Sequence, residues 1–481
     1  MNQTMTQTAT TKPEVFWVWS DEVLKNRIDA YFYQPKFKEL YKVLEGGKYK
    51  VGKLSDLFDG ELIKGILPTH EEKGDEVNVI QISNVDRDGV IDTSDCLTAK
   101  REAYEDKHIL RRNDILVVIT GATIGKVGFW KDEKDNFYLG GDIVKFQVKK
   151  EFDPIFVWAY LRSKFGQKQI LRHITGATNK HLSPDDVASI QIPILPLEKQ
   201  KKVSVIVQSA YAEKRKKEEE AQQVLASIDG FVLGELGIDI AGGHERERER
   251  ERVSEAAPET YVIWSDEIKQ RIDPNFYRPY FKELLRAIHA KNNLTLGEIV
   301  EFSNEIWDQK SIFEDNFPYI EISGIDLKTG DIEEIAQLLT TDAPSRAKMV
   351  VRHNDIIVST TRPNRGAITK ISEEQDGSIA STGFAVLRDL KTDKISRDYL
   401  FVMLRSILSL KQMEQRTTGG NYPAITAEDL KQIRIVVPDR VKQEKITSGV
   451  QSSYAKMRTL RAQAAEVLEN AQKQVEQMIL E

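Results

Sequence analysis

The sequence predicts an α+β protein with an internal, pseudo-twofold duplication. Two similar mixed α/β domains are separated by two long helices that form an antiparallel coiled coil. Three observations predict this fold: segments of one half recur about 240 residues further on, strand-like runs alternate with helical periodicity in each half, and an apolar heptad seam ends each half. With 481 residues the chain is long enough for two or three domains.

Five pairs of segments define the duplication, and they keep the same order in both halves. Their spacing stays nearly constant, which is typical of a repeated structural unit. The pairs are WSDEVLKNRIDAYFYQPKFKEL (19–40) with WSDEIKQRIDPNFYRPYFKEL (264–284), IQISNVD with IEISGID, RRNDILV with RHNDIIV, TGATNKHLSPDDVASIQI with TGGNYPAITAEDLKQIRI, and QKKVSVIVQSAYA with QEKITSGVQSSYA.

Each mixed domain combines short strands with short helices. NVIQIS, DILVVIT and IVKFQV are β-branched runs bounded by turn residues, and PYIEIS, DIIVST and FAVLRD are their counterparts. PIFVWAYLRSKFGQKQI and SRDYLFVMLRSILSLKQM show apolar residues three and four positions apart, as in helices. We expect an α+β domain with a curved sheet in each half. The repeated opening segments should pack each domain onto the ends of the long helices.

The last part of each half carries apolar residues at alternating steps of three and four, which predicts a heptad seam that one helix cannot bury alone. The obvious partner of each helix is the other one, packed antiparallel. The seam residues are Val207, Tyr211, Ala221, Leu225 and Ile228 in the first helix and Val450, Tyr454, Met457, Leu468 and Val475 in the second.

These patterns divide the chain into six parts. The predicted parts are a flexible N-terminal tail (1–18), a first mixed domain (19–196), a central helix (197–236), a charged linker (237–259), a second mixed domain (260–438) and a C-terminal helix (439–481). The linker contains ERERERER at 245–252, where charge repeats and neighbouring glycines favour a solvated connector, with a short helical extension as the alternative.

Composition indicates a globular protein of the reducing cytoplasm. Hydrophobic residues make up 40% of the chain and charged residues 30%, enough for packed cores beneath a charged surface. Cys96 is the single cysteine, which excludes an intrachain disulfide and a cysteine-based zinc cluster. No signal peptide or membrane-spanning run is apparent. The net charge of −6 means that an anion-binding surface must come from local patches.

The two halves differ most at two Gly-rich loops, TGATIGKVGFW against STTRPNRGAITKI and HITGATNKHL against TTGGNYPAI. The first of these fails the spacing of a phosphate-binding loop, because three residues separate its glycines where four are needed. Arg, Lys and Asn at such loops can bind phosphates or read base edges, and a solvated loop face is the alternative. The candidate DNA-binding residues are Arg111, Arg112, Lys126, Asn179, Lys180 and His181 in the first half and Arg352, Arg362, Asn364, Arg365, Asn421 and Tyr422 in the second.

No catalytic or metal-ligating residue is predicted. The chain lacks the base-methylation signatures, a complete phosphate-binding loop and a His-Glu-x-x-His zinc pattern. Asp114 and Asp355 lie in the repeated Asn-Asp-Ile motif, where a turn that enters a strand explains the carboxylate.

In this order and repeated twice, the motifs resemble the DNA specificity subunit of type I restriction-modification systems. RIDxxFYxP, ISxxDxxxG, RxNDI and the segment from TG to the Gln before the heptad helix carry the resemblance, which covers nearly the whole chain. The linker repeat ERERERER is not a fixed feature of that family.

The resemblance implies two target recognition domains, each of which reads one half of a bipartite site on double-stranded DNA. It also implies that the helices hold two methyltransferase subunits, which bring in the restriction (helicase-nuclease) subunits. S-adenosylmethionine, ATP and magnesium then belong to the partners, with no cofactor in this chain. Alternatives are a specificity module of another restriction or phage-defence system, or a coiled-coil scaffold that does not bind DNA.

Overall fold

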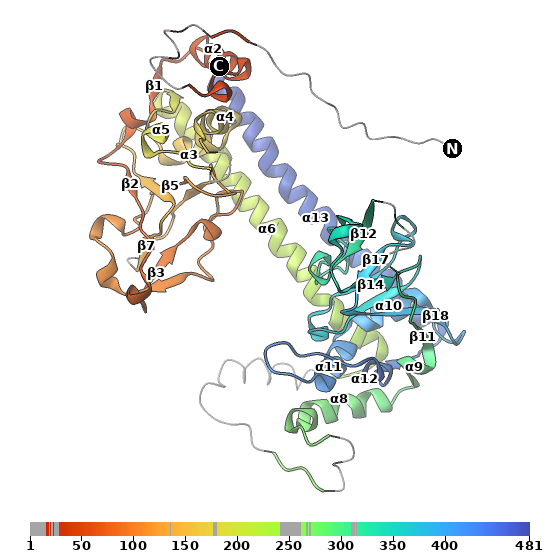
Figure 1. The fold of residues 1–481 in the computed structure, drawn as a ribbon. Helices are drawn as coiled ribbons and strands as arrows, with labels where there is room; N and C mark the ends of the chain where they lie inside the picture. Colours follow the sequence, from red (N-terminus) through yellow and green to blue (C-terminus); the bar gives the residue numbers. More distant parts are fainter. Residues whose placement is uncertain are drawn as a thin grey trace. The chain divides into compact units, whose positions relative to one another are not determined.

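A computed structural model describes residues 16–18, 20, 23, 28–134, 136–176, 180–240, 261–265, 268, 271–308, 313 and 315–481. Its contacts divide the chain into two compact units (Figure 1). The first unit contains residues 1–217 and 462–481, and the second contains residues 218–461. The linker repeat at 245–252 lies outside the described residues. Each unit therefore joins one mixed domain to portions of both long helices.

The first unit holds three small sheets, with strand orders β2-β8-β5-β6, β4-β3-β7 and β1-β9. In the second of these, β3 pairs with β4 antiparallel and with β7 parallel. The strands of the first unit are β1 (Val51–Lys53), β2 (Ile63–Lys64), β3 (Lys73–Ile80), β4 (Leu97–Ala99), β5 (Ile115–Val118), β6 (Val127–Phe129), β7 (Phe137–Leu139), β8 (Ile143–Phe146) and β9 (Gln191–Pro193). Its shorter helices are α2 (Pro35–Glu45), α3 (Pro154–Arg162), α4 (Lys164–His173) and α5 (Pro184–Ala188).

The second unit repeats this plan with sheets β11-β18-β15-β16, β13-β12-β17-β14 and β10-β19. Its strands are β10 (Asn293–Thr295), β11 (Val300–Ser303), β12 (Asn316–Ile320), β13 (Ala336–Leu339), β14 (Ala347–Val350), β15 (Ile356–Ser359), β16 (Ile368–Lys370), β17 (Ile379–Ser381), β18 (Phe384–Leu390) and β19 (Arg434–Val436). Its shorter helices are α8 (Pro279–His289), α9 (Leu296–Ile299), α10 (Arg397–Arg405), α11 (Ile407–Arg416) and α12 (Ala427–Lys431). The mixed α+β class predicted from the sequence is confirmed.

Separate small sheets replace the single curved sheet expected in each domain. The strands are short, from two to eight residues in the first unit, and glycines bring backbones close together between the sheets. A Cβ atom at Gly65 would lie 1.9 Å from the Gly140 carbonyl oxygen. Gly140 itself donates its N–H to Ile80 O in β3 at 2.9 Å. The ladders therefore end after a few residues rather than joining into one surface.

Each helical segment of the repeat is broken once, at a serine. Ser163 separates α3 from α4, and its hydroxyl accepts the N–H groups of Phe165 and Gly166 as an N-cap. Ser406 separates α10 from α11 at the equivalent position. A serine in the extended conformation ends one helix and starts the next in a new direction. Both helices of each pair contribute apolar residues to the core of their own unit.

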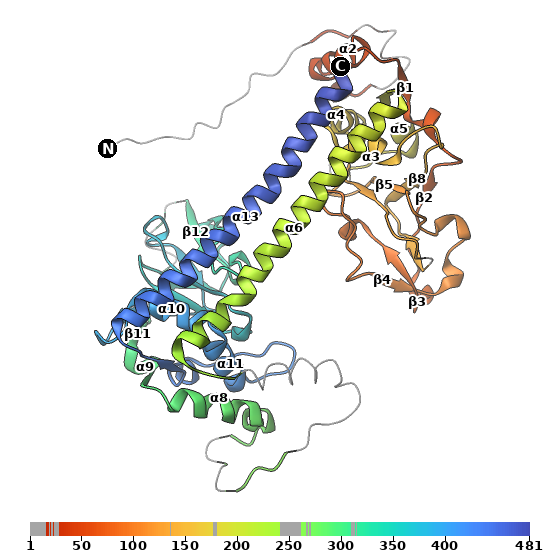
Figure 2. The same ribbon diagram turned by 180° about the vertical axis from the view of Figure 1, so that it is seen from behind.

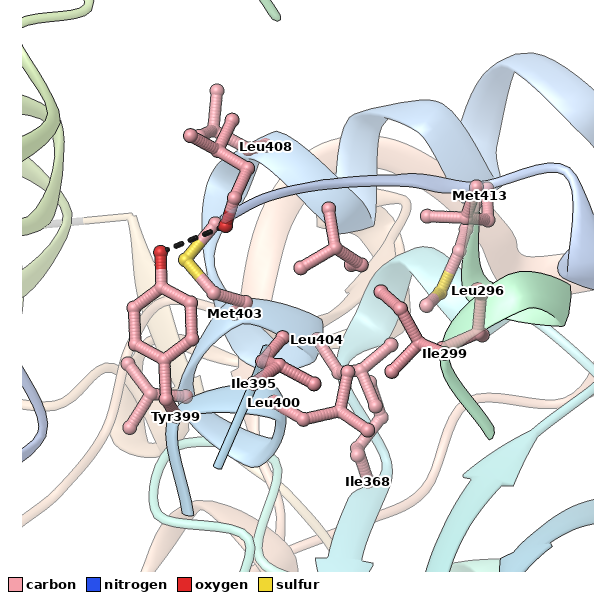
Figure 3. Close-up of a cluster of buried hydrophobic side chains, with 14 of the residues drawn as sticks. Leu296, Ile299, Ile368, Ile395, Tyr399, Leu400, Met403, Leu404, Leu408 and Met413 are labelled. Atoms are coloured by element: carbon pink, nitrogen blue, oxygen red, sulfur yellow. Dashed lines mark hydrogen bonds between the residues drawn. The ribbon is translucent and has the colours of Figure 1, made fainter. Parts of the chain in front are cut away.

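The core of the second unit gathers around α10 and α11 (Figure 3). Leu400, Met403 and Leu404 of α10 pack with Leu296 and other fully buried apolar residues. The hydroxyl of Tyr399 donates to Val436 O at 3.0 Å, so the buried phenol keeps a hydrogen-bond partner. The α10–α11 pair is thereby fixed to the sheet side of the unit through both apolar and polar contacts.

The long helices α6 (Leu197–Leu236) and α13 (Arg440–Leu480) contribute to both units, and their packing on each other is confirmed (Figure 2). In the second unit α6 packs on α13 through a buried cluster of Ala221, Met457 and Leu460. Lys456 pairs with Glu220 at 3.5 Å beside this cluster. Further along α6, Glu235 pairs with Lys445, which lies nearer the start of α13, at 2.8 Å. The two segments therefore run in opposite directions.

Each domain core is completed by the helix that belongs to the other repeat. Val475 and Ile479, near the end of α13, are buried in the core of the first unit. Val232 and Leu236, near the end of α6, occupy the corresponding place in the second unit. Burial of such side chains contributes about 1.5–3 kcal/mol each. A repeat therefore does not contain all of its own core.

The opening segments pack each domain onto these helix ends. Leu40 and Leu44 of α2 belong to the core cluster that contains Val475 and Ile479. Leu284 of α8 belongs to the cluster that contains the end of α6. The sequence similarity of the two segments thus maintains a shared packing site.

Residues 1–15 lie outside the described part of the chain. Among the described residues, no helix is long and apolar enough to cross a membrane.

Candidate nucleic-acid interface

Two loops meet at one end of strand β5 in the first unit. We call residues 119–126 the strand-end loop and the segment 175–181, of which 177–179 lie outside the described residues, the hairpin loop. The two together are the tip pair. Thr175 and His181 exchange backbone hydrogen bonds of 2.9 and 2.8 Å, and Leu182 N–H donates to Ile119 O at 2.8 Å. Lys180 is exposed and His181 half-buried, whereas Asn179 lies outside the described residues. The structure therefore brings the two variable loops of this half together.

The second unit builds its tip pair in the same way from a strand-end loop, residues 360–367, and a hairpin loop, residues 418–424. Thr418 and Ala424 exchange hydrogen bonds of 2.9 Å each, and Ile425 N–H donates to Thr360 O at 2.8 Å. The candidate residues Asn364, Arg365, Asn421 and Tyr422 are exposed here, Tyr422 by 74%. The framework bonds are the same as in the first unit, and the side chains that they present are different.

Arg362 departs from ordinary backbone geometry. Its φ is 48° and its ψ 51°, in the left-handed region. The aligned residue of the first unit is Gly121, with φ of 82°. Both copies therefore need a left-handed turn at this point, and an arginine takes a position that favours glycine. Such outliers cluster at functional sites, because the surrounding structure must hold them in place.

Arg111, Arg112 and Arg352 lie away from the tip pairs, although the sequence grouped them with these loops. They precede β5 and β15, whereas the tip pairs follow the same strands. Arg112 pairs with Glu133 at 2.7 Å and Arg352 pairs with Glu305. Acidic neighbours at this end of the strands thus reduce the positive charge available to a phosphate. The three arginines remain predicted contacts, in a place separate from the tips.

Lys126 also has a local role that its sequence position did not indicate. The residue is half-buried in the strand-end loop. Its Nζ donates to Val85 O at 2.8 Å and so ties this loop to the segment that follows β3. The equivalent residue of the second unit is Ala367, which is buried and lacks this donor.

The Asn-Asp turns support the start of β5 and β15. Asn113 and Asn354 have φ of 71° and 70°, which asparagine tolerates better than most residues. Asp114 accepts Arg111 N–H at 2.9 Å and pairs with buried Lys145 at 2.8 Å. Asp355 accepts Arg352 N–H at 2.8 Å. These carboxylates have a structural explanation, as predicted from the turn motif.

A cluster of charges surrounds Asp355 in the second unit. Arg388 pairs with Asp355 at 2.9 Å and with Glu305 at 2.5 Å. The hydrogen bond from Arg352, followed by that from Arg388, lowers the pKa of Glu305 against the opposing effect of burial. The pKa of Arg388 is raised, chiefly by its hydrogen bond to Asp355. The arginines and carboxylates of this cluster neutralise each other. Within the described ranges, no set of three or more His, Cys, Asp or Glu side chains could hold a metal ion.

Some of the predicted seam residues are buried between the two helices, and others are buried against the domains. Ala221 and Met457 are buried where α6 meets α13, with Leu225 and Tyr454 packed against them. The remaining seam residues belong to the domain cores or to the surface of the helices. Val207 and Val475 lie in the core of the first unit, Val450 lies in that of the second, Ile228 packs against the latter, and Leu468 is half-buried.

Tyr211 takes a different place from the one that the heptad pattern predicts. Its ring centroid lies 5.1 Å from that of Trp158 in α3, and its hydroxyl donates to Asp88 O and accepts from Arg162. Burial raises the pKa of the Tyr211 hydroxyl. The phenol thus joins the helix to the domain. The large, polar-ended side chain finds its hydrogen-bond partners there and not in an apolar seam.

Sequence reasoning missed the positions of Trp158, Arg162 and Asp88 at this junction and the left-handed turn at Arg362. The repeat alignment contained a signal for the turn, since it places an arginine opposite a glycine in a Gly-rich loop. It contained none for the Lys126 contact, because backbone carbonyl acceptors leave no trace in the sequence.

Comparison with known families identifies both halves. The family model described as type I restriction modification DNA specificity domain matches residues 46–224 and again residues 290–470. These two matches cover well over half of the chain. The chain belongs to this family. A relative, the type I restriction enzyme HindI specificity subunit of Haemophilus influenzae, is 27% identical over 107 residues, which are 22% of this chain and 23% of that subunit.

Solved structures of type I restriction-modification proteins also resemble the chain at low identity. The S subunit from M. genitalium is 14% identical with a TM-score of 0.40, over 91% of this chain and 97% of that one. A chain from a structure on complex assembly and conformational transition of the type I R-M system is 16% identical with a TM-score of 0.49, over 90% and 97%. The HsdS subunit from Thermoanaerobacter tengcongensis is 17% identical with a TM-score of 0.35, over 90% and 95%.

Proposed function

We propose that this chain is the non-catalytic subunit that selects the DNA target of a type I restriction-modification complex. Each domain reads one half of an asymmetric, bipartite site through its tip pair. One observation carries the proposal: both units build the tip pair with matching backbone hydrogen bonds, yet present different side chains there. A common framework with different tips is suited to two different half-sites.

The chemistry of the tips supports base reading rather than general attraction to DNA. The net charge is −6, so the whole chain does not supply a positive field. Arg and Asn side chains form bidentate hydrogen bonds with base edges, and Arg365 and Asn364 are exposed at the second tip. Lys180 is exposed at the first. Partner subunits then share the phosphate contacts on which affinity depends.

The proposed partners are two methyltransferase subunits, held by the long helices and the adjoining domain surfaces, and the restriction subunits that join them. S-adenosylmethionine, ATP and magnesium bind to those partners. This division of labour rests on the family and on the duplicated framework, since a repeated surface suits two copies of one partner.

Footprinting of the complex assembled with its methyltransferase subunits on a random-sequence DNA library tests this proposal. We expect protection of two short sequences of different composition, separated by a fixed unread gap. Exchange of residues 360–367 and 418–424 for their first-unit counterparts should convert the second half-site toward the first. Protection without any bipartite sequence, or methylation by the isolated chain, contradicts the proposal.

A further inference from the structure

The second tip pair contains an exposed aromatic ring that is held by a strained arginine. The guanidinium carbon of Arg362 lies 4.8 Å from the centroid of the Tyr422 ring. Its Nη2 donates to Asn421 O at 2.8 Å, and its backbone N–H donates to Pro423 O at 2.7 Å. One residue of the strand-end loop thus contacts three consecutive residues of the hairpin loop.

These contacts use the groups with which Arg362 would otherwise read a base. One guanidinium nitrogen already donates to a carbonyl, and the cation lies against the ring. Tyr422 is 74% exposed, so most of its ring and hydroxyl remain accessible. An exposed aromatic ring can pack against a base or a thymine methyl group, which buries the apolar face of the ring.

We propose that Arg362 is a positioning residue that holds the Tyr422 ring in place for an aromatic contact with a base of the second half-site. This inference rests on the proposed function. The left-handed backbone at Arg362 is maintained because the arginine orders the hairpin loop before DNA arrives, which lowers the entropy cost of binding. The first unit has Gly121 at this position and therefore builds its contact differently.

A double-mutant cycle on the full chain, assembled with its methyltransferase subunits, tests the inference. Binding is measured by competition between duplexes that carry single base-pair changes in either half-site. Tyr422→Ala should weaken second half-site discrimination by about 5- to 150-fold, the range for one base pair of a duplex site that is no longer read. Tyr422→Phe should retain most of it. Arg362→Gly should weaken it by a smaller factor and leave the first half-site unchanged.

The decisive measurement is Arg362→Gly in the Tyr422→Ala background. If Arg362 acts through Tyr422, the double variant should match Tyr422→Ala within about twofold, because the two changes remove one shared contact. Arg365→Ala is the matched control from the same tip, where the side chain is exposed. Its effect should multiply with that of Tyr422→Ala. Effects of Arg362→Gly that multiply in the same way overturn the inference and make Arg362 a direct DNA contact.

Thermal unfolding separates positioning from a general structural role. Arg362→Gly removes backbone strain, because glycine adopts the left-handed conformation easily. The melting temperature should therefore stay the same or rise. A lower melting temperature with equal weakening of both half-sites contradicts the inference. The proposed function has a separate test, since a footprint without a bipartite site rejects it before any variant is compared.

Discussion

The two helix–domain junctions have the same framework and different packing. In the first unit Trp158 stacks on Tyr211 and donates to Val127 O at 2.9 Å, and Lys214 pairs with Asp88 at 2.5 Å. In the second unit the aligned positions hold Phe401 and Tyr454, and a cavity of about 400 Å³ opens beside them. Ring and ion-pair contacts bridge the first junction, whereas the second lines an open pocket.

This difference shows that the repeats conserve the path of the backbone more strictly than the packing at the junction. The cavity lies among α6, α10 and α13 and is lined by Leu225, Val232, Arg405 and Tyr454, among others. Protein interiors are normally close-packed, so a smaller side chain at position 401 forgoes contacts that the first unit makes. We therefore expect the second junction to contribute less to the stability of its unit.

The largest expected effect concerns the helix ends that complete the two cores. Val475→Asp should destabilise the first unit, and the aligned Val232→Asp should destabilise the second, because each places an unpaired carboxylate in a buried site. We expect losses of about 3–5 kcal/mol in the free energy of unfolding. Hydrogen exchange resolved by peptide measures each unit separately. Equal loss of protection in both units after either change contradicts this assignment.

Truncation of the aromatic residue at each junction should have a larger effect on stability in the first unit than in the second. Trp158→Ala removes a side chain that is 3% exposed, together with its hydrogen bond, and should reduce the stability of the first unit by about 3–5 kcal/mol. Phe401→Ala is the matched control at a half-buried position and should cost about 1–2 kcal/mol. Denaturant-dependent hydrogen exchange gives both values. Equal losses would mean that the cavity does not weaken the second junction.

Filling the cavity should bring the second junction closer to the first. Phe401→Trp introduces the residue that the first unit has at this position, and we expect a gain of about 0.5–1 kcal/mol in the stability of the second unit. The midpoint of chemical denaturation, followed by peptides of residues 218–461, measures the gain. A loss of stability would show that the cavity does not accept an indole without strain.

The smallest effect concerns acid. The pKa of Glu305 lies below its ordinary value of 4.5, so its ion pairs stabilise the folded second unit above that pH, and this contribution is lost as pH falls through the lowered pKa. Glu305→Gln should cost up to about 1 kcal/mol at pH 7, as for partly exposed pairs. The difference from the unchanged protein should shrink as the pH falls below 4.5 and vanish below the lowered pKa of Glu305. A difference that persists in acid would indicate a packing effect instead.

The sequence predicted the duplication, the mixed fold class and the two long helices, because repeated segments and heptad spacing record these features directly. It also predicted that the function lies where the repeats differ. It did not predict that Tyr211 turns toward the domain, since a heptad pattern does not distinguish a helix partner from a domain partner. The separation of Arg352 from the second tip could have been predicted, because Arg352 precedes β15 and the tip follows it, and the two ends of a strand lie apart.

The completion of each core by the other repeat's helix has a consequence for biosynthesis. The second unit uses residues 218–461, all of which are translated before residues 462–481. The first unit needs Val475 and Ile479, which are translated after every residue of the second unit. Domains of most chains fold in the order of synthesis. Here the domain made first should complete its core last, and its apolar core residues lack the contacts of Val475 and Ile479 until that segment has been translated.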